Sequence, residues 1–207
     1  MPVITFREAL RRLSPLPVGA VVNTHHHWDH SFGNAVFLPA PIWGHERCAE
    51  RMRAEGSLTR DKLGLGYPTE AEWFGEVEIV PPDRTFTDST ILECGSRRIA
   101  LHHLGLAHTD NDIVVVVDDG QAVFAGDLVE QAAPPFFGDG YPLEWPVVCE
   151  RLLGLIHGAV VPGHGAVVDR AFVEEQAAEI TEVAYLAAER HAAGMPAADA
   201  ARAGGPF

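Results

Sequence analysis

Short apolar runs that end in polar residues recur along the chain and predict strands that finish in loops. The runs contain valine or isoleucine, as buried strands usually do, and they occupy residues 18–23, 113–117, 122–125 and 160–162. Two further stretches, 85–92 and 97–103, alternate around Cys94-Gly95-Ser96 and predict a hairpin. Another turn, Asp118-Asp119-Gly120, has the composition of a hairpin turn between the strands on either side of it.

Helical patterns fall between these runs. We expect helices at residues 5–13, 31–36, 45–55 and 146–155, and a long C-terminal helix that Asp169 caps and that extends to about His191. Gly56 is expected to stop the helix before it, so that residues 57–75, which are rich in glycine and polar side chains, form a loop. Residues 194–207 are expected to be a loose tail of a single domain that spans residues 1–207.

Four side chains of metal-ligand type lie within six residues directly after the first apolar run: His25, His27, Asp29 and His30. Imidazole nitrogen and carboxylate oxygen are donors that suit zinc, and catalytic zinc keeps one position open for water. If this segment is extended, His25 and His27 point to the same side and His26 points away. One metal ion can then take these two histidines, and a second can take Asp29 and His30 at the turn into a helix.

Three later segments supply the ligands that this cluster lacks. Each places a ligand-type residue in a turn beside a strand-like run, an arrangement typical of active sites at strand ends. The three residues are His108 in Ala107-His108-Thr109, Asp127 after Gly126, and His164 in Pro162-Gly163-His164-Gly165. His108 would complete the first site, His164 would complete the second, and Asp127 could bridge both.

In this order, the H-x-H-x-D-H cluster, the A-H-T segment, the G-D pair and the P-G-H-G segment resemble the metallo-β-lactamase fold superfamily of hydrolases. The resemblance extends from about Val18 to Ala166. It implies an α+β fold, an αββα sandwich of two mixed sheets with helices outside and metals at one rim. It also implies two Zn²⁺ ions, with iron or manganese as alternatives, held by His25, His27, Asp29, His30, His108, Asp127 and His164.

The ligand types determine the chemistry that we expect. Two metal ions that share Asp127 and a bridging hydroxide lower the pKa of that water and polarise the substrate, with Asp29 and Asp127 as the acidic residues of the catalytic centre. Because residue 127 is an aspartate, the chain resembles glyoxalase II and lactonase-like members more than the lactamases that use cysteine there. We therefore expect a hydrolase of a small ester, thioester, lactone or lactam.

Two alternatives to this function follow from the same residues. One is a mononuclear-iron thiol or persulfide dioxygenase of the same fold, because imidazole and carboxylate suit iron as well as zinc. The other is an inactive truncated remnant. The metal content per chain distinguishes them, since two zinc ions indicate the hydrolase, one iron the dioxygenase, and none the remnant.

The remaining histidines and several aromatic residues have simpler interpretations. We expect His45 at the entry to a helix, with a place in the lining of the cleft as the alternative. His102 and His103 are expected in a strand, and His157 and His191 on helices, in structural or solvent-exposed roles. Trp73-Phe74 and the loop at 134–137 either form an apolar wall for the substrate, with Tyr141 as a polar group near it, or pack beneath long loops.

Composition narrows the expected partners. The chain has 207 residues, 47% of them hydrophobic, which is enough to bury a sizeable core. Its 15 basic and 29 acidic residues give a net charge of −14, so we expect a small-molecule substrate and neither nucleic acid nor a membrane as partner. Three cysteines cannot form a complete set of disulfides, and no signal peptide is evident, so we expect a cytoplasmic protein.

The chain departs from the superfamily pattern before the histidine cluster. Superfamily members usually have several strands there, whereas this chain reaches His25 after one short helix and one strand. We favour a start that is internal to a longer reading frame. The alternative is a genuine short form that is either marginally folded or completed by a partner. In a short form the strand at 18–23 would expose unpaired backbone groups, so we expect poor solubility or self-association that bound metal offsets in part.

Overall fold

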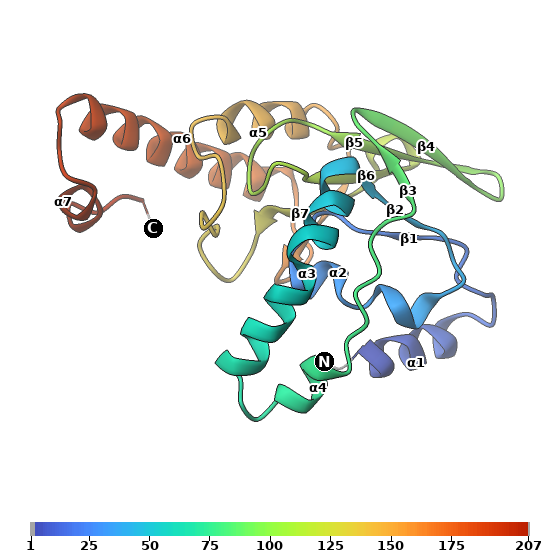
Figure 1. The fold of residues 1–207 in the computed structure, drawn as a ribbon. Helices are drawn as coiled ribbons and strands as arrows, with labels where there is room; N and C mark the ends of the chain where they lie inside the picture. Colours follow the sequence, from blue (N-terminus) through green and yellow to red (C-terminus); the bar gives the residue numbers. More distant parts are fainter. Residues whose placement is uncertain (1–2, 207) are drawn as a thin grey trace. The chain divides into compact units, whose positions relative to one another are not determined.

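The structure is a computed structural model that describes residues 3–206, and it divides into two compact units, Met1–Thr87 and Asp88–Phe207. Both units mix helices and strands, as expected for an α+β chain (Figure 1). That residues 1–207 act as a single domain remains a prediction. No helix among the described residues is both long and apolar enough to cross a membrane.

The first unit contains a small parallel sheet in the order β1-β2-β3. Its helices and strands, in chain order, are α1 (Val3–Leu13), β1 (Val21–Val22), α2 (Trp28–Ser31), the 3₁₀ helix η1 (Asn34–Phe37), β2 (Ile42–His45), α3 (Glu46–Gly66), α4 (Ala71–Gly75) and β3 (Arg84–Phe86).

Strand β1 is shorter than the sequence pattern predicts, because only Val21 and Val22 pair with β2. The residue that precedes β2 is Pro41, which accepts a hydrogen bond from the Val21 N–H at 2.9 Å. Proline has no N–H to donate, so the ladder cannot continue past it in the direction of residue 18.

Helix α3 overturns the prediction that Gly56 ends a helix and that residues 57–75 form a loop. The helix continues through Gly56 to Gly66, and α4 follows it. Gly56 is buried, and a Cβ atom there would lie 2.8 Å from Cγ2 of Ile79. Close packing therefore explains this glycine, at the cost of about 1 kcal/mol of helix propensity relative to alanine.

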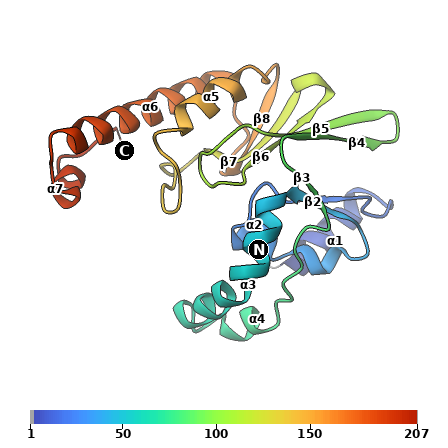
Figure 2. The same ribbon diagram turned by 45° about the horizontal axis from the view of Figure 1, so that its top comes forward.

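The second unit is built on a five-stranded sheet in the order β4-β5-β6-β7-β8 (Figure 2). Strands β4 to β7 are antiparallel neighbours, and β8 runs parallel to β7. The elements of this unit are β4 (Ser89–Cys94), β5 (Arg97–His103), β6 (Ile113–Val117), the 3₁₀ helix η2 (Asp118–Gly120), β7 (Ala122–Glu130), α5 (Trp145–Leu153), β8 (Ala159–His164), α6 (Arg170–Ala192) and α7 (Ala197–Arg202).

The core of the second unit lies between this sheet and helices α5 and α6. Val114 and Val123 come from the sheet, Trp145 and Leu152 from α5, and Ile180 from α6, and each of these side chains is fully buried. Close-packed apolar side chains of this kind hold the ends of the strands in fixed positions.

Both hairpins of this sheet agree with the sequence pattern, although the stretch 85–92 splits between β3 and β4, which belong to different sheets. Asp169 caps α6 as predicted and accepts a hydrogen bond from the Phe172 N–H at 3.0 Å. The expectation of a loose tail is wrong, because α7 forms there and the Arg190 guanidinium donates to the carbonyl of Ala200 at 2.8 Å.

Candidate metal centre

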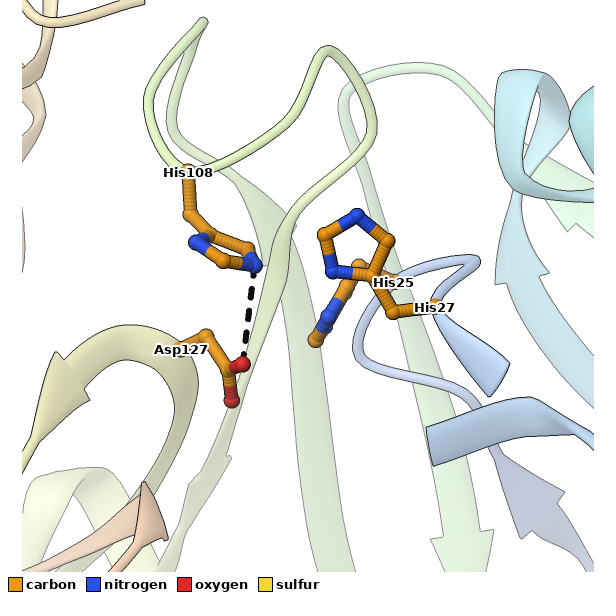
Figure 3. Close-up of side chains that lie close together, drawn as sticks. All are labelled: His25, His27, His108 and Asp127. Carbon is orange, nitrogen blue, oxygen red and sulfur yellow. Dashed lines mark ion pairs between the residues drawn. The ribbon is translucent and has the colours of Figure 1, made fainter. Parts of the chain in front are cut away.

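The histidine cluster of the first unit occupies irregular backbone between β1 and α2. His25 is fully buried, and its ring centroid lies 4.7 Å from that of His27 and 4.3 Å from that of His30. The rings of His25 and His27 are nearly perpendicular, at 82° (Figure 3). The structure therefore brings three of the predicted ligands of this unit together.

His26 does not point away from its neighbours as predicted. Residues 24–27 form a succession of bends, so the alternation of a strand does not apply to them. The ring centroid of His26 lies 4.7 Å from that of His27. The alternation argument for the shared side of His25 and His27 also fails, although the two rings do lie close together.

Polar side chains of the first unit hold this loop. The Ser31 hydroxyl lies 2.9 Å from the His26 carbonyl and 2.8 Å from the His27 carbonyl, and it donates to them. Asn23 and Asn34 form a buried reciprocal amide pair, with N···O distances of 2.9 and 2.8 Å. The Asn23 amide also donates to the His30 carbonyl at 3.0 Å, so the pair is joined to the backbone of the cluster.

Asp29 and His30 lie on α2, close to the predicted turn into a helix. Oδ2 of Asp29 lies 3.3 Å from Nε2 of His30, and both side chains are only partly exposed. A carboxylate and an imidazole at this separation present two donor atoms toward the same point, which suits a shared cation.

In the second unit, Asp127 lies between two histidines. Its Oδ2 atom lies 3.5 Å from Nε2 of His108, as Figure 3 shows, and 3.4 Å from Nε2 of His164. Asp127 and His108 are buried, whereas the His164 side chain is 47% exposed. The structure thus brings together all three residues that the sequence predicts for this unit.

A bend in β7 directs the Asp127 side chain. The register of β7 against β8 shifts on either side of Gly126, whose φ of 56° lies in the left-handed region that glycine adopts readily. Irregularities of this kind change the direction of the side chains that follow. Asp127 comes directly after the shift.

Gly163 on β8 leaves room for the Asp127 carboxylate. A Cβ atom built on Gly163 would overlap Oδ1 of Asp127. The φ of Gly163 is not positive, so its backbone does not require glycine. The absence of a side chain at residue 163 is therefore a requirement of space.

The His108 ring is oriented by the backbone of the loop after β7. Its Nδ1 atom lies 3.0 Å from the carbonyl oxygen of Phe136, and because a carbonyl only accepts, Nδ1 carries the hydrogen. The lone pair of Nε2 then faces Asp127. A second hydrogen-bond partner on the other ring nitrogen is typical of histidines that bind metal ions.

The turn after His108 is fixed by Asp112. Its carboxylate accepts from the Thr109 N–H at 2.6 Å and from the Thr109 hydroxyl at 2.9 Å. The carbonyl of Asp112 lies 2.7 Å from Nδ1 of His103 on β5. These bonds are all buried or partly buried, so they limit the movement of the His108 backbone.

The histidines outside the site behave largely as expected. His45 is the N-cap of α3, where its Nδ1 accepts from the Arg47 N–H at 3.2 Å. His102 and His103 lie on β5, and His191 lies on α6. His157 is an exception, because it lies in the bend between α5 and β8 and not on a helix.

Burial also identifies polar residues that the sequence pattern did not single out. Asn23, Ser31, Asn34 and Glu130 are all buried. Glu130 lies three residues after Asp127, and a charged residue directly after the apolar pair Leu128-Val129 would have been the available signal.

The arrangement of ligand-type residues on a mixed α+β fold is typical of metal-dependent enzymes, and comparison with known proteins defines the class further. The profile of the metallo-beta-lactamase superfamily matches residues 2–181. The chain belongs to this superfamily. The predicted α+β fold of the metallo-β-lactamase type is confirmed by the family match and by similar structures.

Curated relatives match only part of the chain. Metallo-beta-lactamase type 2 of Bacillus cereus is 37% identical over 87 residues, which are 39% of this chain and 34% of that protein. The corresponding protein of Bacillus sp. (strain 170) is 34% identical over 86 residues, again 39% of this chain and 34% of that protein. The match thus spans about a third of the length of these relatives.

Solved structures match most of the chain at low identity. A metallo-beta-lactamase from Pontibacter korlensis has a TM-score of 0.67 and 20% identity, covering 86% of this chain and 76% of that one. The structure of TMB-1 has a TM-score of 0.65 and 16% identity, covering 86% and 74%. At these identities the likeness establishes the fold alone.

Proposed function

We propose that the chain is a metal-dependent hydrolase that binds two divalent ions, with zinc as the native metal. His25, His27 and His108 would hold the first ion, and Asp29, His30 and His164 the second. Asp127 would contribute to both. The proposal assumes that the ligand groups of the two units act on the same pair of ions, as the superfamily match over residues 2–181 suggests.

One observation carries the two-metal part of this proposal. A single oxygen of Asp127 lies within 3.5 Å of His108 and within 3.4 Å of His164, two histidines that the proposal assigns to different ions. A carboxylate in that position suits a pair of cations better than one, because it can offset positive charge on both sides. The same geometry makes a mononuclear iron site the weaker interpretation.

The residues present fit such ions. Buried imidazoles and carboxylates are the donor set of hydrolytic zinc sites, and the hydrogen bond from Nδ1 of His108 to Phe136 leaves Nε2 as its ligand atom. When bound, the ions would supply Lewis-acid polarisation of a carbonyl and a more acidic water.

The role of the protein side chains is to place charge and to orient donors. Asp127 adds negative charge at a buried position, which favours cation binding there. His108 is aligned before any ligand arrives, since its ring is hydrogen-bonded to the backbone. The His164 side chain is more exposed than Asp127, so solvent and a small substrate would reach this ligand most easily.

The substrate that we propose is a small acyl compound: an ester, a thioester, a lactone or a lactam. Phe136, which orients His108 through its carbonyl, exposes 59% of its surface, so an apolar group of the substrate could contact it. No cysteine is among the candidate ligands, and Asp127 supports activity of the glyoxalase II or lactonase type. The lactam class stays in the proposal because the relatives that match are named as metallo-beta-lactamases. We place this activity in the cytoplasm.

Metal analysis and a substrate panel test the proposal together. The protein would be purified without added metal, loaded with zinc, freed of excess ion, and assayed on esters, thioesters, lactones and β-lactams. We expect two zinc ions per chain and hydrolysis of at least one acyl class, abolished by chelation and restored by zinc. If the purified protein instead contains one iron ion per chain and consumes oxygen with a thiol substrate, the dioxygenase hypothesis replaces the hydrolase hypothesis. No bound metal would refute both.

A further inference from the structure

Glu130 is a buried carboxylate at the end of β7, three residues after Asp127, and only 5% of it is exposed. Its backbone is bound on both sides by Gln176 of α6. The Gln176 amide donates to the Glu130 carbonyl at 2.6 Å, and its side-chain oxygen accepts from the Glu130 N–H at 3.3 Å. The position of Glu130 is therefore tied to the longest helix of the second unit.

The Glu130 side chain is connected to His108 through one peptide unit. Its Oε1 atom accepts a hydrogen bond from the Phe136 N–H at 3.2 Å, and the Phe136 carbonyl accepts from Nδ1 of His108 at 3.0 Å. The same Oε1 atom lies 3.8 Å from Nδ1 of His108. The Phe136 backbone is thus held between a carboxylate and an imidazole.

The segment between Glu130 and Phe136 needs such an anchor. Ala132 has a φ of 75°, in the left-handed region that alanine rarely adopts. Strained backbone persists only where surrounding contacts stabilise it, and it is common near functional sites. The bond between Glu130 and Phe136 closes the loop that contains this residue.

We propose that Glu130 is a positioning residue for His108. By holding the Phe136 peptide in place, it keeps the carbonyl on Nδ1 and so keeps Nε2 of His108 directed at Asp127. The inference deepens the proposed function, on which its metal-binding part rests. The part that concerns the orientation and tautomer of His108 holds for the metal-free protein as well.

Two measurements on the full chain test this role. In metal-free protein at a pH where the ring is neutral, long-range ¹H–¹⁵N NMR reports which nitrogen of His108 carries the hydrogen, with the signal assigned by its loss in His108→Ala. Zinc affinity is measured separately by competition with a chromophoric chelator. We expect wild type to be almost entirely the Nδ1–H tautomer.

Glu130→Ala should give a mixture of tautomers and a zinc affinity lower by roughly 10- to 100-fold, the usual effect of removing a group that orients a metal ligand. Glu130→Gln keeps an oxygen acceptor for the Phe136 N–H and should stay close to wild type. Glu130→Asp keeps the charge but withdraws the acceptor by one methylene, so it should resemble the alanine variant. If Glu130→Ala does not fold, the tautomer and zinc affinity of Glu130→Asp test the role of Glu130.

Asp169→Ala is the matched control. It removes the cap of α6 and should lower thermal stability without changing the tautomer or the zinc affinity. A wild-type tautomer and affinity in both Glu130→Ala and Glu130→Asp would overturn the proposal, as would a Gln variant as impaired as the alanine one. If wild type binds no zinc, the proposed function fails, but the tautomer still decides the role of Glu130.

Discussion

Asp127 and His164 lie on strands of a five-stranded sheet with a buried apolar core, and His108 lies in a loop between two of its strands. His25 and His27, in contrast, lie on irregular backbone that follows a strand of two residues. In the second unit the donors are positioned by packed strands. In the first unit they are positioned by a few polar side chains, chiefly Ser31 and the pair Asn23 and Asn34.

The two units therefore hold their candidate ligands in place in different ways. Packed strands keep their ends in place whether or not a ligand is bound. A loop held by a few hydrogen bonds opens more easily, since local stability follows the number of buried contacts. We therefore expect core substitutions in the second unit to act mainly on its stability, and ligand substitutions in the histidine loop to act mainly on metal binding.

The largest effect is expected for His27→Ala. This partly buried ring contributes little packing, so the variant should remain folded while it loses one metal ion and at least about 100-fold in hydrolytic activity. Metal content and kcat/KM on the best substrate of the panel check this. His26→Ala, in the adjacent position, is the control and should keep both ions and its activity. A fully active, fully loaded His27→Ala would remove this residue from the site.

A core substitution in the second unit should have the next largest effect. Leu152→Ala deletes a fully buried side chain of α5 and should lower the free energy of unfolding by about 2–5 kcal/mol. Urea unfolding monitored by fluorescence and far-UV circular dichroism measures it. Zinc affinity per folded molecule should not change, and a loss of affinity comparable to that of His27→Ala would contradict the contrast between the units.

Asn34→Ala tests the polar support of the first unit. The change leaves the buried amide of Asn23 and the Val80 carbonyl without their Asn34 bonds, which should cost about 1–3 kcal/mol. Hydrogen exchange should show the loss at residues 23–34 and not in β7. Added zinc should restore protection there in part, because the ions bind only the ordered loop. An equal loss of hydrogen-exchange protection in both units would contradict the expectation that Asn34→Ala destabilises the first unit alone.

The smallest effect concerns Cys149 in the core of the second unit. Burial, with a smaller contribution from Glu150, raises the pKa of its thiol to about 12 from 9.0. The unfolded chain ionises this thiol first, so its contribution to stability is complete below pH 9 and is lost as pH rises toward 12. Relative to Cys149→Ala, wild type should lose at most about 1.4 kcal/mol between pH 9 and pH 10, the interval in which the effect is measured. Rapid labelling of native Cys149 at pH 8, at a rate like that of exposed Cys94, would contradict its burial.

Local patterns predicted the elements of the second unit well. The apolar runs of β6 and β7 and the capped helix α6 follow directly from residue spacing. The predictions were wrong where contacts between residues far apart in the sequence determine where a helix or strand ends. Gly56 packs against Ile79, and Pro41 limits the pairing of β1. Neither contact can be recognised from a window of neighbouring residues.

The proximity of the candidate ligands within each unit could be predicted from their types and order, since His25, His27 and His30 do lie together and Asp127 does lie between His108 and His164. The direction of His26 was wrong because the loop is bent and not extended. The residues that support the ligands were missed for a different reason. Hydrogen bonds such as those of Gln176 with Glu130 join residues far apart in the chain.

The close approach of the Asp127 carboxylate to Gly163 sets a limit on how this protein can vary. Because any Cβ atom at residue 163 would collide with Asp127, even alanine there must displace the carboxylate or part β7 from β8. Any variant with a substitution at residue 163 would therefore have a displaced Asp127. A library built to change the substrate range should therefore keep residue 163 as glycine and diversify the loop around Phe136, whose side chain is largely in solvent.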